Sequence, residues 1–161
     1  MNYDIILISG DRMEKQIRIK DLKAMQDFAK EVNQHLFSGF VLCLSGDLGA
    51  GKTTFTQFLG ESMGIQDAIN SPTFTLMKIY EHTLPLYHID AYRLEGVGSD
   101  QQLEEYIYGN GVCVIEWYEY IINSIPKACL MIDIEWVSQD ERLLRLKGSG
   151  MYETIIEKLG D

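Results

Sequence analysis

Apolar positions recur along the chain at two spacings, one helical and one extended, and together they predict alternating strands and helices. The clearest helical stripe follows Asp21, a candidate N-cap, over residues 22–36, and its members are Leu22, Met25, Phe28, Ala29, Val32 and Leu36. The run FVLCLSG, residues 40–46, is continuously apolar and ends in glycine, which is typical of a buried parallel strand. A helix is predicted over 52–64, ended by Gly64. Further strands are predicted at 3–9, 71–81, 84–94, 111–117, 128–137 and 142–148, and further helices at 100–109 and 150–160.

This mixture of elements predicts an α/β sandwich with a partly parallel β-sheet, in which the strand pairs after residue 72 are antiparallel. The chain has 161 residues and shows no internal repeat, low-complexity tract or linker. That length is sufficient to bury a hydrophobic core without disulfides or structural metal ions. We therefore expect one domain over residues 1–161.

Composition adds an expected location. No apolar run approaches the roughly 18 residues that a membrane-spanning helix needs, and the start MNYDIILISGDRM lacks the basic residues of a signal peptide. The three cysteines, Cys43, Cys113 and Cys129, each lie in an apolar stretch and form no C-x-x-C pair. We expect a soluble cytoplasmic protein, with no membrane partner, whose cysteines are reduced thiols in the core.

Charge argues against one class of partner. The formal net charge is −10, with 24 acidic residues against 14 basic ones. A net-acidic surface repels a phosphate backbone, so the chain alone is a poor candidate for strong nucleic-acid binding. Any connection to RNA is therefore expected to run through a protein partner.

The segment GDLGAGKT, residues 46–53, carries the strongest chemical signal. Gly46, Gly51, Lys52 and Thr53 match the phosphate-binding pattern G-x-x-x-x-G-K-[ST], which average composition produces by chance in roughly half a percent of chains this long. A predicted strand precedes the segment and a predicted helix follows it, as the pattern requires. Loop amides and the helix N-terminus would then face a β-phosphate, Lys52 would reach the β- and γ-phosphates, and the Thr53 hydroxyl would ligate Mg²⁺.

Such a loop needs an acid from a neighbouring strand to hold Mg²⁺ or its water. Glu116 ends the apolar run GVCVI and is the best candidate, with a solvated strand-end acid as the alternative. Asp90 shares a strand face with His88 and could be a second acid near the metal and the attacking water, or part of a buried salt-bridge network. Trp117 could stack on a base or simply pack.

A loop rich in hydroxyl groups lies between the predicted helix at 52–64 and the strand that carries Asp90. It contains Ser71, Pro72 and Thr73, in the sequence NSPTFTL. This is where a switch segment that senses a γ-phosphate would lie, ordered by the triphosphate and released on hydrolysis. By composition alone it is a turn with a short strand.

Four segments together, GDLGAGKTT, SPTFTL, HIDAYRL and VIEW, closely resemble the TsaE (YjeE) family of bacterial ATPases. They span residues 46–117, and the predicted elements on either side also fit the family. The resemblance implies a P-loop NTPase fold, a three-layer sandwich with a mixed sheet, that binds ATP and Mg²⁺ and hydrolyses ATP weakly. It also implies a role in the tRNA modification N6-threonylcarbamoyladenosine at position 37, through the partner proteins TsaD and TsaB. TsaD performs the transfer in that pathway, so tRNA would be contacted only indirectly.

The resemblance also implies roles for individual residues. Thr53 and Glu116 become the magnesium ligands. The switch loop becomes Ser71, Pro72 and Thr73. The catalytic set becomes Lys52, Asp90 and Glu116, and the choice of base between the two acids is left open. Arg142 falls where a late arginine of the family approaches the nucleotide, although Arg145 is nearby. Many members have a Thr near the position of Met25, so the pocket beside the adenine would have a different lining in this chain. The nucleotide-contacting residues expected are Asp47, Leu48, Gly49, Ala50, Gly51, Lys52, Thr53, Thr54, Asp90, Trp117 and Arg142.

Three other functions compete with a partner-dependent accessory ATPase. A small-molecule kinase would use the same loop, but the sequence shows no lid region with clustered arginines that could close over two substrates. A GTPase switch would need an N-K-x-D stretch to read guanine, and none is present. A nucleotide-binding module without hydrolysis remains open from sequence.

Overall fold

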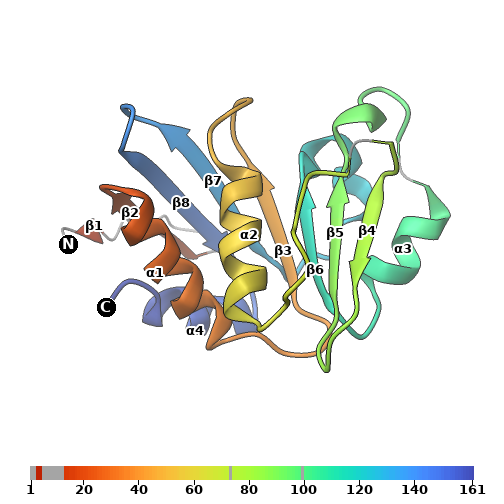
Figure 1. Ribbon diagram of the computed structural model, residues 1–161, viewed down its shortest axis with the longest axis horizontal. Coiled ribbons are helices and arrows are strands. Elements are labelled where there is room, and N and C mark those ends of the chain that lie inside the picture. The colour runs from red at the N-terminus through yellow and green to blue at the C-terminus, as the bar shows by residue number, and fades with distance from the viewer. Residues whose placement is uncertain (1–2, 5–12, 73, 99) are drawn as a thin grey trace.

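The structure is a computed structural model that describes residues 3–4, 13–72, 74–98 and 100–161. One mixed sheet of eight strands runs through it in the order β1-β2-β8-β7-β3-β6-β5-β4 (Figure 1). The strands are β1 (Tyr3–Asp4), β2 (Met13–Ile19), β3 (Val41–Ser45), β4 (Met77–Tyr80), β5 (Leu86–Asp90), β6 (Val112–Glu116), β7 (Leu130–Trp136) and β8 (Arg142–Gly148). The helices are α1 (Leu22–Asn33), α2 (Lys52–Ser62), α3 (Gln101–Ile107) and α4 (Met151–Lys158), with 3₁₀ segments η1 (Tyr92–Leu94) and η2 (Tyr118–Ser124). Of the strand predicted at 3–9, only Tyr3–Asp4 lies within the described residues.

The pairing of the strands confirms a partly parallel sheet and corrects one expectation. Strands β7, β3, β6 and β5 form a parallel centre, and antiparallel pairs lie on both sides of it. The strand pairs after residue 72 are therefore not all antiparallel, because β5 pairs with β6 in parallel. Helix α3 lies in the connection between those two strands. Such a crossover returns the chain to the end of the sheet at which β5 began, so that β6 can run parallel to it.

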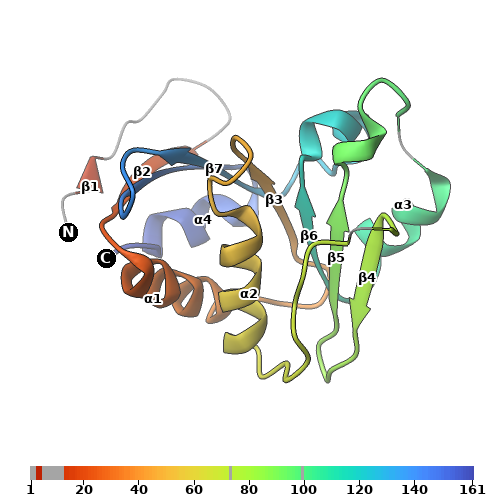
Figure 2. The ribbon, with the colours of Figure 1, turned by 45° about the horizontal axis from the view of Figure 1, so that its top comes forward.

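Helices cover both faces of the central strands, so apolar side chains of these strands are buried on both sides of the sheet. Leu42 and Leu44 of β3 join a core under α1, α2 and α4, whereas Val41 and Cys43 join a second core that includes residues of α3 and η2. The two sides are visible in Figure 2, with α1, α2 and α4 on one side of the sheet and α3 on the other. This arrangement gives the three layers that the family resemblance implied.

Local signals placed most helix boundaries within a few residues. Helix α1 begins after Asp21, whose carboxylate accepts a hydrogen bond from Ala24 N at 2.7 Å, and it ends at Asn33 rather than residue 36. Helix α2 ends at Ser62, and Gly64 follows with a positive φ of 92°. All three cysteines are buried free thiols, as expected. Within the described ranges, no helix is both long enough and apolar enough to cross a membrane.

The parallel strands β3, β5 and β6 all direct their carboxyl ends to one edge of the sheet. β3 ends at Ser45, and residues 46–51 then lead into α2. β5 ends at Asp90 and β6 at Glu116, and these two acids lie opposite each other in the register of the pair. The edge therefore brings the glycine-rich loop and both predicted acids together, which is where ligands of open α/β sheets bind.

Candidate functional site

The loop between β3 and α2 is shaped by glycines. Gly46 has φ +141°, and a Cβ atom there would lie 2.5 Å from the carbonyl oxygen of Ile134, so only glycine fits. Gly49 has φ +80° and open space around it. Helix α2 begins at Lys52 after Gly51, and no side chain caps its N-terminus. The first amides of α2 therefore point from the end of the helix toward the edge of the sheet, with the favourable partial charge of the helix behind them.

Lys52 is folded back over this loop. Its ammonium donates hydrogen bonds to the carbonyl oxygens of Gly46 and, at 3.1 Å, Asp47, and it lies 4.1 Å from the centre of the Trp117 ring. Burial lowers the pKa of Lys52, while the nearby carboxylates, Glu116 foremost, act in the opposite direction. The charge of this lysine is thus held by carbonyl dipoles and an aromatic face at the loop itself.

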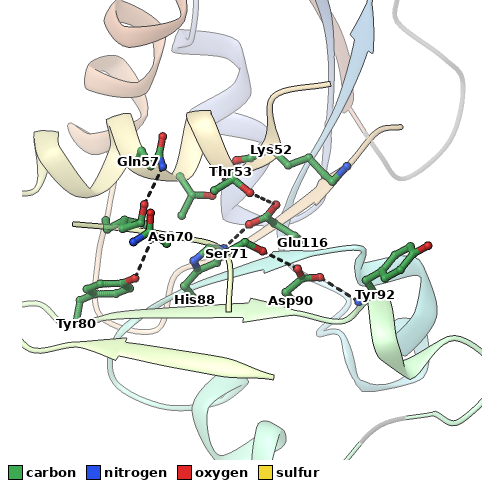
Figure 3. A network of polar contacts seen from close by, with 12 residues as sticks. Lys52, Thr53, Gln57, Asn70, Ser71, Tyr80, His88, Asp90, Tyr92 and Glu116 are labelled. Carbon is green, nitrogen blue, oxygen red and sulfur yellow. Dashed lines mark hydrogen bonds and ion pairs between the residues drawn. The ribbon is translucent and has the colours of Figure 1, made fainter. Parts of the chain in front are cut away.

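Glu116 is the most buried acid at the site, with 2% of its surface exposed. Its Oε1 accepts a hydrogen bond from the Thr53 hydroxyl at 2.9 Å, and its Oε2 contacts Nε2 of His88 (Figure 3). The parallel register puts His88 opposite Val114, two residues before the Asp90–Glu116 position. The first helical turn of α2, the end of β6 and the middle of β5 are therefore joined through one carboxylate.

Asp90 lies beside Glu116 and holds the segment that precedes β4. Its Oδ2 accepts from the Ser71 hydroxyl at 2.9 Å, and its Oδ1 accepts from the backbone N–H of Tyr92 at 3.0 Å. Figure 3 shows both contacts. Of the expected switch loop, Ser71 thus contacts an acid of the site and Pro72 is buried next to it, while Thr73 lies outside the described residues.

Two further hydrogen bonds fix the chain just before Ser71. Gln57 of α2 donates to the Ile69 carbonyl oxygen at 2.8 Å, and the backbone N–H of Asn70 donates to the Tyr80 hydroxyl at 3.3 Å (Figure 3). Helix α2 and strand β4 therefore hold this segment from two sides. As a result, the Ser71 hydroxyl is presented to Asp90 by a supported backbone.

A cavity of about 200 Å³ opens between these groups. It joins the start of α2 to the ends of β5 and β6. Its lining residues are Leu48, Gly49, Gly51, Lys52, Thr53, Thr54, Ser71, Asp90, Glu116 and Trp117. The lining combines backbone of the loop, one cation, two carboxylates and three hydroxyls, a donor and acceptor set suited to a phosphate group and a hard cation.

Trp117 forms the aromatic wall of this cavity. It is the one non-glycine residue with a positive φ, 58°, in the part of the chain that the structure describes. Its ring is stacked on Tyr120, with centroids 5.8 Å apart, and lies 5.1 Å from Tyr92. Trp117 is therefore packed between a lysine and two tyrosines, and its unusual backbone conformation turns the chain sharply after Glu116.

The two late arginines point to opposite faces of β8. Arg142 Nε donates to the Ala50 carbonyl oxygen at 2.8 Å, and its NH1 donates to Ser138 O at 2.8 Å. Arg145 instead pairs with Asp133 and Glu135 on the other face. Arg142 thus hydrogen-bonds the glycine-rich loop directly, whereas Arg145 lines a separate cavity of about 440 Å³ that Gly46 and Asp47 of the loop also border.

Beside Arg142 lies a second cavity of about 340 Å³, on the α1 side of the loop. It includes Met25, the position where the resemblance suggested a difference in lining. The full lining is Ile19, Asp21, Leu22, Met25, Gly49, Ala50, Gly51, Thr54, Gln139, Asp140 and Arg142. The loop thus separates the cavity at Asp90 and Glu116 from a larger one, which adds the apolar side chains of Ile19, Leu22 and Met25 to its own two acids.

The structure brings nearly all sequence-predicted site residues to these two cavities. Asp47 contributes its backbone carbonyl to Lys52, while Leu48 is 87% exposed at the tip of the loop. Sequence reasoning missed that His88 contacts Glu116, although it had set His88 on the same face as Asp90. It also missed Gln139 and Asp140, for which the sequence carries no signal.

The fold and site together define an α/β protein with a candidate site at the carboxyl ends of parallel strands, next to the start of a helix. Comparison with known proteins then identifies the family. A sequence model of the TsaE family, described as threonylcarbamoyl adenosine biosynthesis protein TsaE, matches residues 19–144. The chain belongs to the TsaE family.

Relatives and a solved structure agree with this assignment. The tRNA threonylcarbamoyladenosine biosynthesis protein TsaE of Bacillus subtilis is 47% identical over 123 residues, which cover 75% of this chain and 78% of that protein. The protein of the same description from Treponema pallidum is 40% identical over 74% of this chain and 93% of its own length. The crystal structure of YdiB from Bacillus subtilis superposes with a TM-score of 0.80 at 36% sequence identity, covering 94% of this chain and 97% of that one.

Proposed function

We propose that this protein is a P-loop ATPase that binds ATP with Mg²⁺ and hydrolyses it slowly, as an accessory component of tRNA N6-threonylcarbamoyladenosine synthesis. One observation carries the proposal more than any other. The hydroxyl of Thr53, in the first turn of α2, is 2.9 Å from the buried carboxylate of Glu116 at the end of the neighbouring β6. Membership of the TsaE family gives this geometry its biological setting.

Phosphate binding falls to the loop and to Lys52. The amides at the start of α2 supply donors without a capping side chain in the way, which supports an anion site. Lys52 is held on carbonyl oxygens of the same loop, so it needs only to move its ammonium from those oxygens to phosphate oxygens. The other residues of the loop would contact the phosphates mainly through backbone groups, and they are Asp47, Leu48, Gly49, Ala50, Gly51 and Thr54.

The donor set around Thr53 fits magnesium. Mg²⁺ takes oxygen ligands, and proteins usually hold it through one or two carboxylates together with substrate phosphates. Thr53 and Glu116 offer a hydroxyl and a carboxylate side by side, whereas no group of three or more His, Cys, Asp or Glu in the described residues could hold a metal. When bound, the ion would neutralise charge that develops on the phosphates.

Asp90 is assigned to the water that attacks the γ-phosphate. It lines the same cavity as Lys52 and Glu116, and its carboxylate already accepts hydrogen bonds from Ser71 and from the backbone of Tyr92. The switch loop would be formed by Ser71, Pro72 and Thr73, because a change in the position of Asp90 would alter its hydrogen bond with the Ser71 hydroxyl. Whether Asp90 or Glu116 acts as base is decided by the variants proposed below.

The remainder of the nucleotide is assigned to the larger cavity. Arg142 and Met25 line it beside the loop. Gly51 and Thr54 line both this cavity and the proposed phosphate site, so the two are adjacent. Arg142 would orient the loop through the Ala50 carbonyl while standing next to the nucleotide. Trp117 is assigned a contact with the bound nucleotide from the opposite side, through the cavity that it shares with Lys52.

The proposed partners are TsaD and TsaB, with tRNA contacted only indirectly in the cytoplasm. The net charge of −10 supports indirect contact, because an acidic protein is repelled by the phosphate backbone of tRNA. A protein partner would then bring it to the tRNA. The ATPase would then act on the TsaD–TsaB complex, without being the transferase itself. The competing function, a small-molecule kinase, would instead transfer the γ-phosphoryl group to a metabolite.

Phosphate release separates these functions. The purified protein is incubated with ATP and Mg²⁺ alone and then with TsaD and TsaB. We expect slow release that the partners alter, and none above background for Lys52→Ala, because that variant loses the cation that binds the phosphates. Rapid phosphorylation of an added metabolite would overturn the proposal in favour of a kinase, and partner-independent release would remove TsaD and TsaB from it.

A further inference from the structure

His88 is a fully buried histidine beneath the proposed magnesium position. It lies on β5 two residues before Asp90, on the sheet face that α2 covers, and none of its surface is exposed. Its Nε2 contacts Oε2 of Glu116, the oxygen that the Thr53 hydroxyl does not bond. Figure 3 shows the three side chains in a row, from α2 through β6 to β5.

The other ring nitrogen determines which form of the imidazole fits this site. Within the described residues, Nδ1 of His88 is buried without a hydrogen-bond partner. A carboxylate only accepts hydrogen bonds, so Nε2 must carry the hydrogen that is shared with Glu116. A hydrogen on Nδ1 would be a buried donor without a partner, and such a donor is costly. The Nε2–H tautomer avoids this cost.

We propose that His88 is a positioning residue whose Nε2–H holds one oxygen of Glu116, so that the other faces Thr53 and the proposed magnesium position. This inference rests on the proposed function. Without His88, Glu116 can rotate about its terminal bond, and its second oxygen has no fixed direction. The histidine acts through Glu116 and touches neither the nucleotide nor the metal.

Two substitutions separate positioning from packing. His88→Gln places an amide N–H near the position of Nε2, whereas His88→Leu fills similar space without a donor. Binding of a fluorescent ATP analogue is measured in EDTA, ATP hydrolysis is measured in a Mg²⁺ titration, and thermal unfolding is followed for each variant. We expect His88→Leu to bind the analogue normally in EDTA, but to need about 10-fold or more Mg²⁺ for half-maximal turnover, the usual loss for an outer-shell partner. His88→Gln is expected to recover most of this loss.

A double-mutant cycle shows whether the effect passes through Glu116. In a Glu116→Gln background, adding His88→Leu is expected to leave the Mg²⁺ requirement unchanged within about twofold, because the carboxylate to be positioned is already absent. Equal losses in both backgrounds, or a Mg²⁺ requirement unchanged in His88→Leu of the natural chain, would overturn the inference alone. Failure of the natural chain to bind the analogue would overturn the proposed function and this inference with it.

The tautomer provides a spectroscopic readout that does not depend on activity. The chain has three histidines, so the imidazole ¹⁵N signals can be assigned by comparing the natural chain with His88→Gln. We expect His88 to show a protonated Nε2 and an unprotonated Nδ1. A proton on Nδ1 would contradict the geometry on which the inference rests, even if His88→Leu failed to fold.

Discussion

At the scale of single residues, Glu116 connects the parts of the site. A carboxylate that is 2% exposed is costly to bury unless its oxygens are hydrogen-bonded, and here Thr53 and His88 bond one oxygen each. Asp90, directly beside it, uses its own oxygens on Ser71 and on the backbone of Tyr92. The two acids therefore have different partners, and we expect different consequences when each is neutralised.

Isosteric substitutions separate the two acids. Glu116→Gln and Asp90→Asn are each expected to lower turnover by on the order of 10², the usual effect of losing a metal ligand or a general base. Only Glu116→Gln should also raise the Mg²⁺ concentration needed for half-maximal rate, because only Glu116 is paired with Thr53. Steady-state hydrolysis across a Mg²⁺ series measures both quantities, with the exposed acid Glu105→Gln as control. Unchanged hydrolysis in Asp90→Asn would remove Asp90 from the catalytic set.

At the scale of elements, the junction of β3 and α2 depends on close backbone approach. Gly46 leaves β3 against the carbonyl oxygen of Ile134 in β7, whereas Gly49 stands in open space at the tip of the loop. Both have a positive φ, so a residue with a side chain would be strained at either position. Only at Gly46 would its Cβ atom also clash with the backbone of a neighbouring strand. The fold thus fixes where the loop leaves the sheet.

Alanine at each position tests that distinction. Gly49→Ala is expected to lower the free energy of unfolding by about 1 kcal/mol, through left-handed strain alone. Gly46→Ala is expected to cost more, about 2–3 kcal/mol, since the new Cβ must also displace the backbone of β7. Urea unfolding followed by circular dichroism measures both. Equal costs would show that β7 does not constrain the loop at Gly46.

Sequence alone predicted most elements, and its main omission was β2. In MEKQIRI the core-facing positions are Lys15, Ile17 and Ile19, and a lysine at the first of them breaks the apolar alternation. Lys15 is buried there because its ammonium donates to the Glu157 carbonyl oxygen at 3.2 Å and pairs with Asp161. Those partners are more than 140 residues away, so a local pattern cannot reveal them.

At the site, too, local features were predictable and long-range contacts were not. Thr53 and Glu116 follow from local rules, because one begins a helix and the other ends an apolar strand. The contact of His88 with Glu116 required the parallel register of β5 and β6, which the sequence pattern had not indicated. Arg142 and Arg145 were separable only once the pairing of β8 showed which face each occupies.

At the scale of the whole molecule, α4 ties the end of the chain to the central strand. The Tyr152 hydroxyl accepts a hydrogen bond from the backbone N–H of Val41 at 3.0 Å, across 111 residues of sequence. The Tyr152 ring packs edge-on against Phe40, with centroids 5.1 Å apart. This contact supports the start of β3, the strand that ends at the glycine-rich loop.

Removing that hydroxyl should destabilise the entire fold. Tyr152→Phe is expected to lower the free energy of unfolding by about 1–3 kcal/mol, since it leaves a buried N–H unpaired. Thermal and urea unfolding measure the loss, with the exposed Tyr108→Phe as a control. Equal stability of Tyr152→Phe and the natural chain would show that the bond contributes nothing.

The pH dependence of the same pair has a definite sign. Burial raises the pKa of Tyr152 above its ordinary value of 10.0. As the pH rises past that value the unfolded chain ionises first, so the natural protein loses stability while Tyr152→Phe, which has no such group, is spared this loss. The stability difference between the two is therefore expected to shrink above pH 10. A difference that grows with pH would contradict this burial.

The edge formed by β3, β5 and β6 is proposed to hold ATP and Mg²⁺. A crystal structure with a non-hydrolysable ATP analogue and Mg²⁺ would show whether it does. We expect phosphates on the loop from Gly46 to Thr54, the ion about 2.0–2.1 Å from the Thr53 hydroxyl, Glu116 on the ion or its water, and Asp90 facing the γ-phosphate. An analogue bound away from this loop, or an ion held without Thr53 and Glu116, would contradict it.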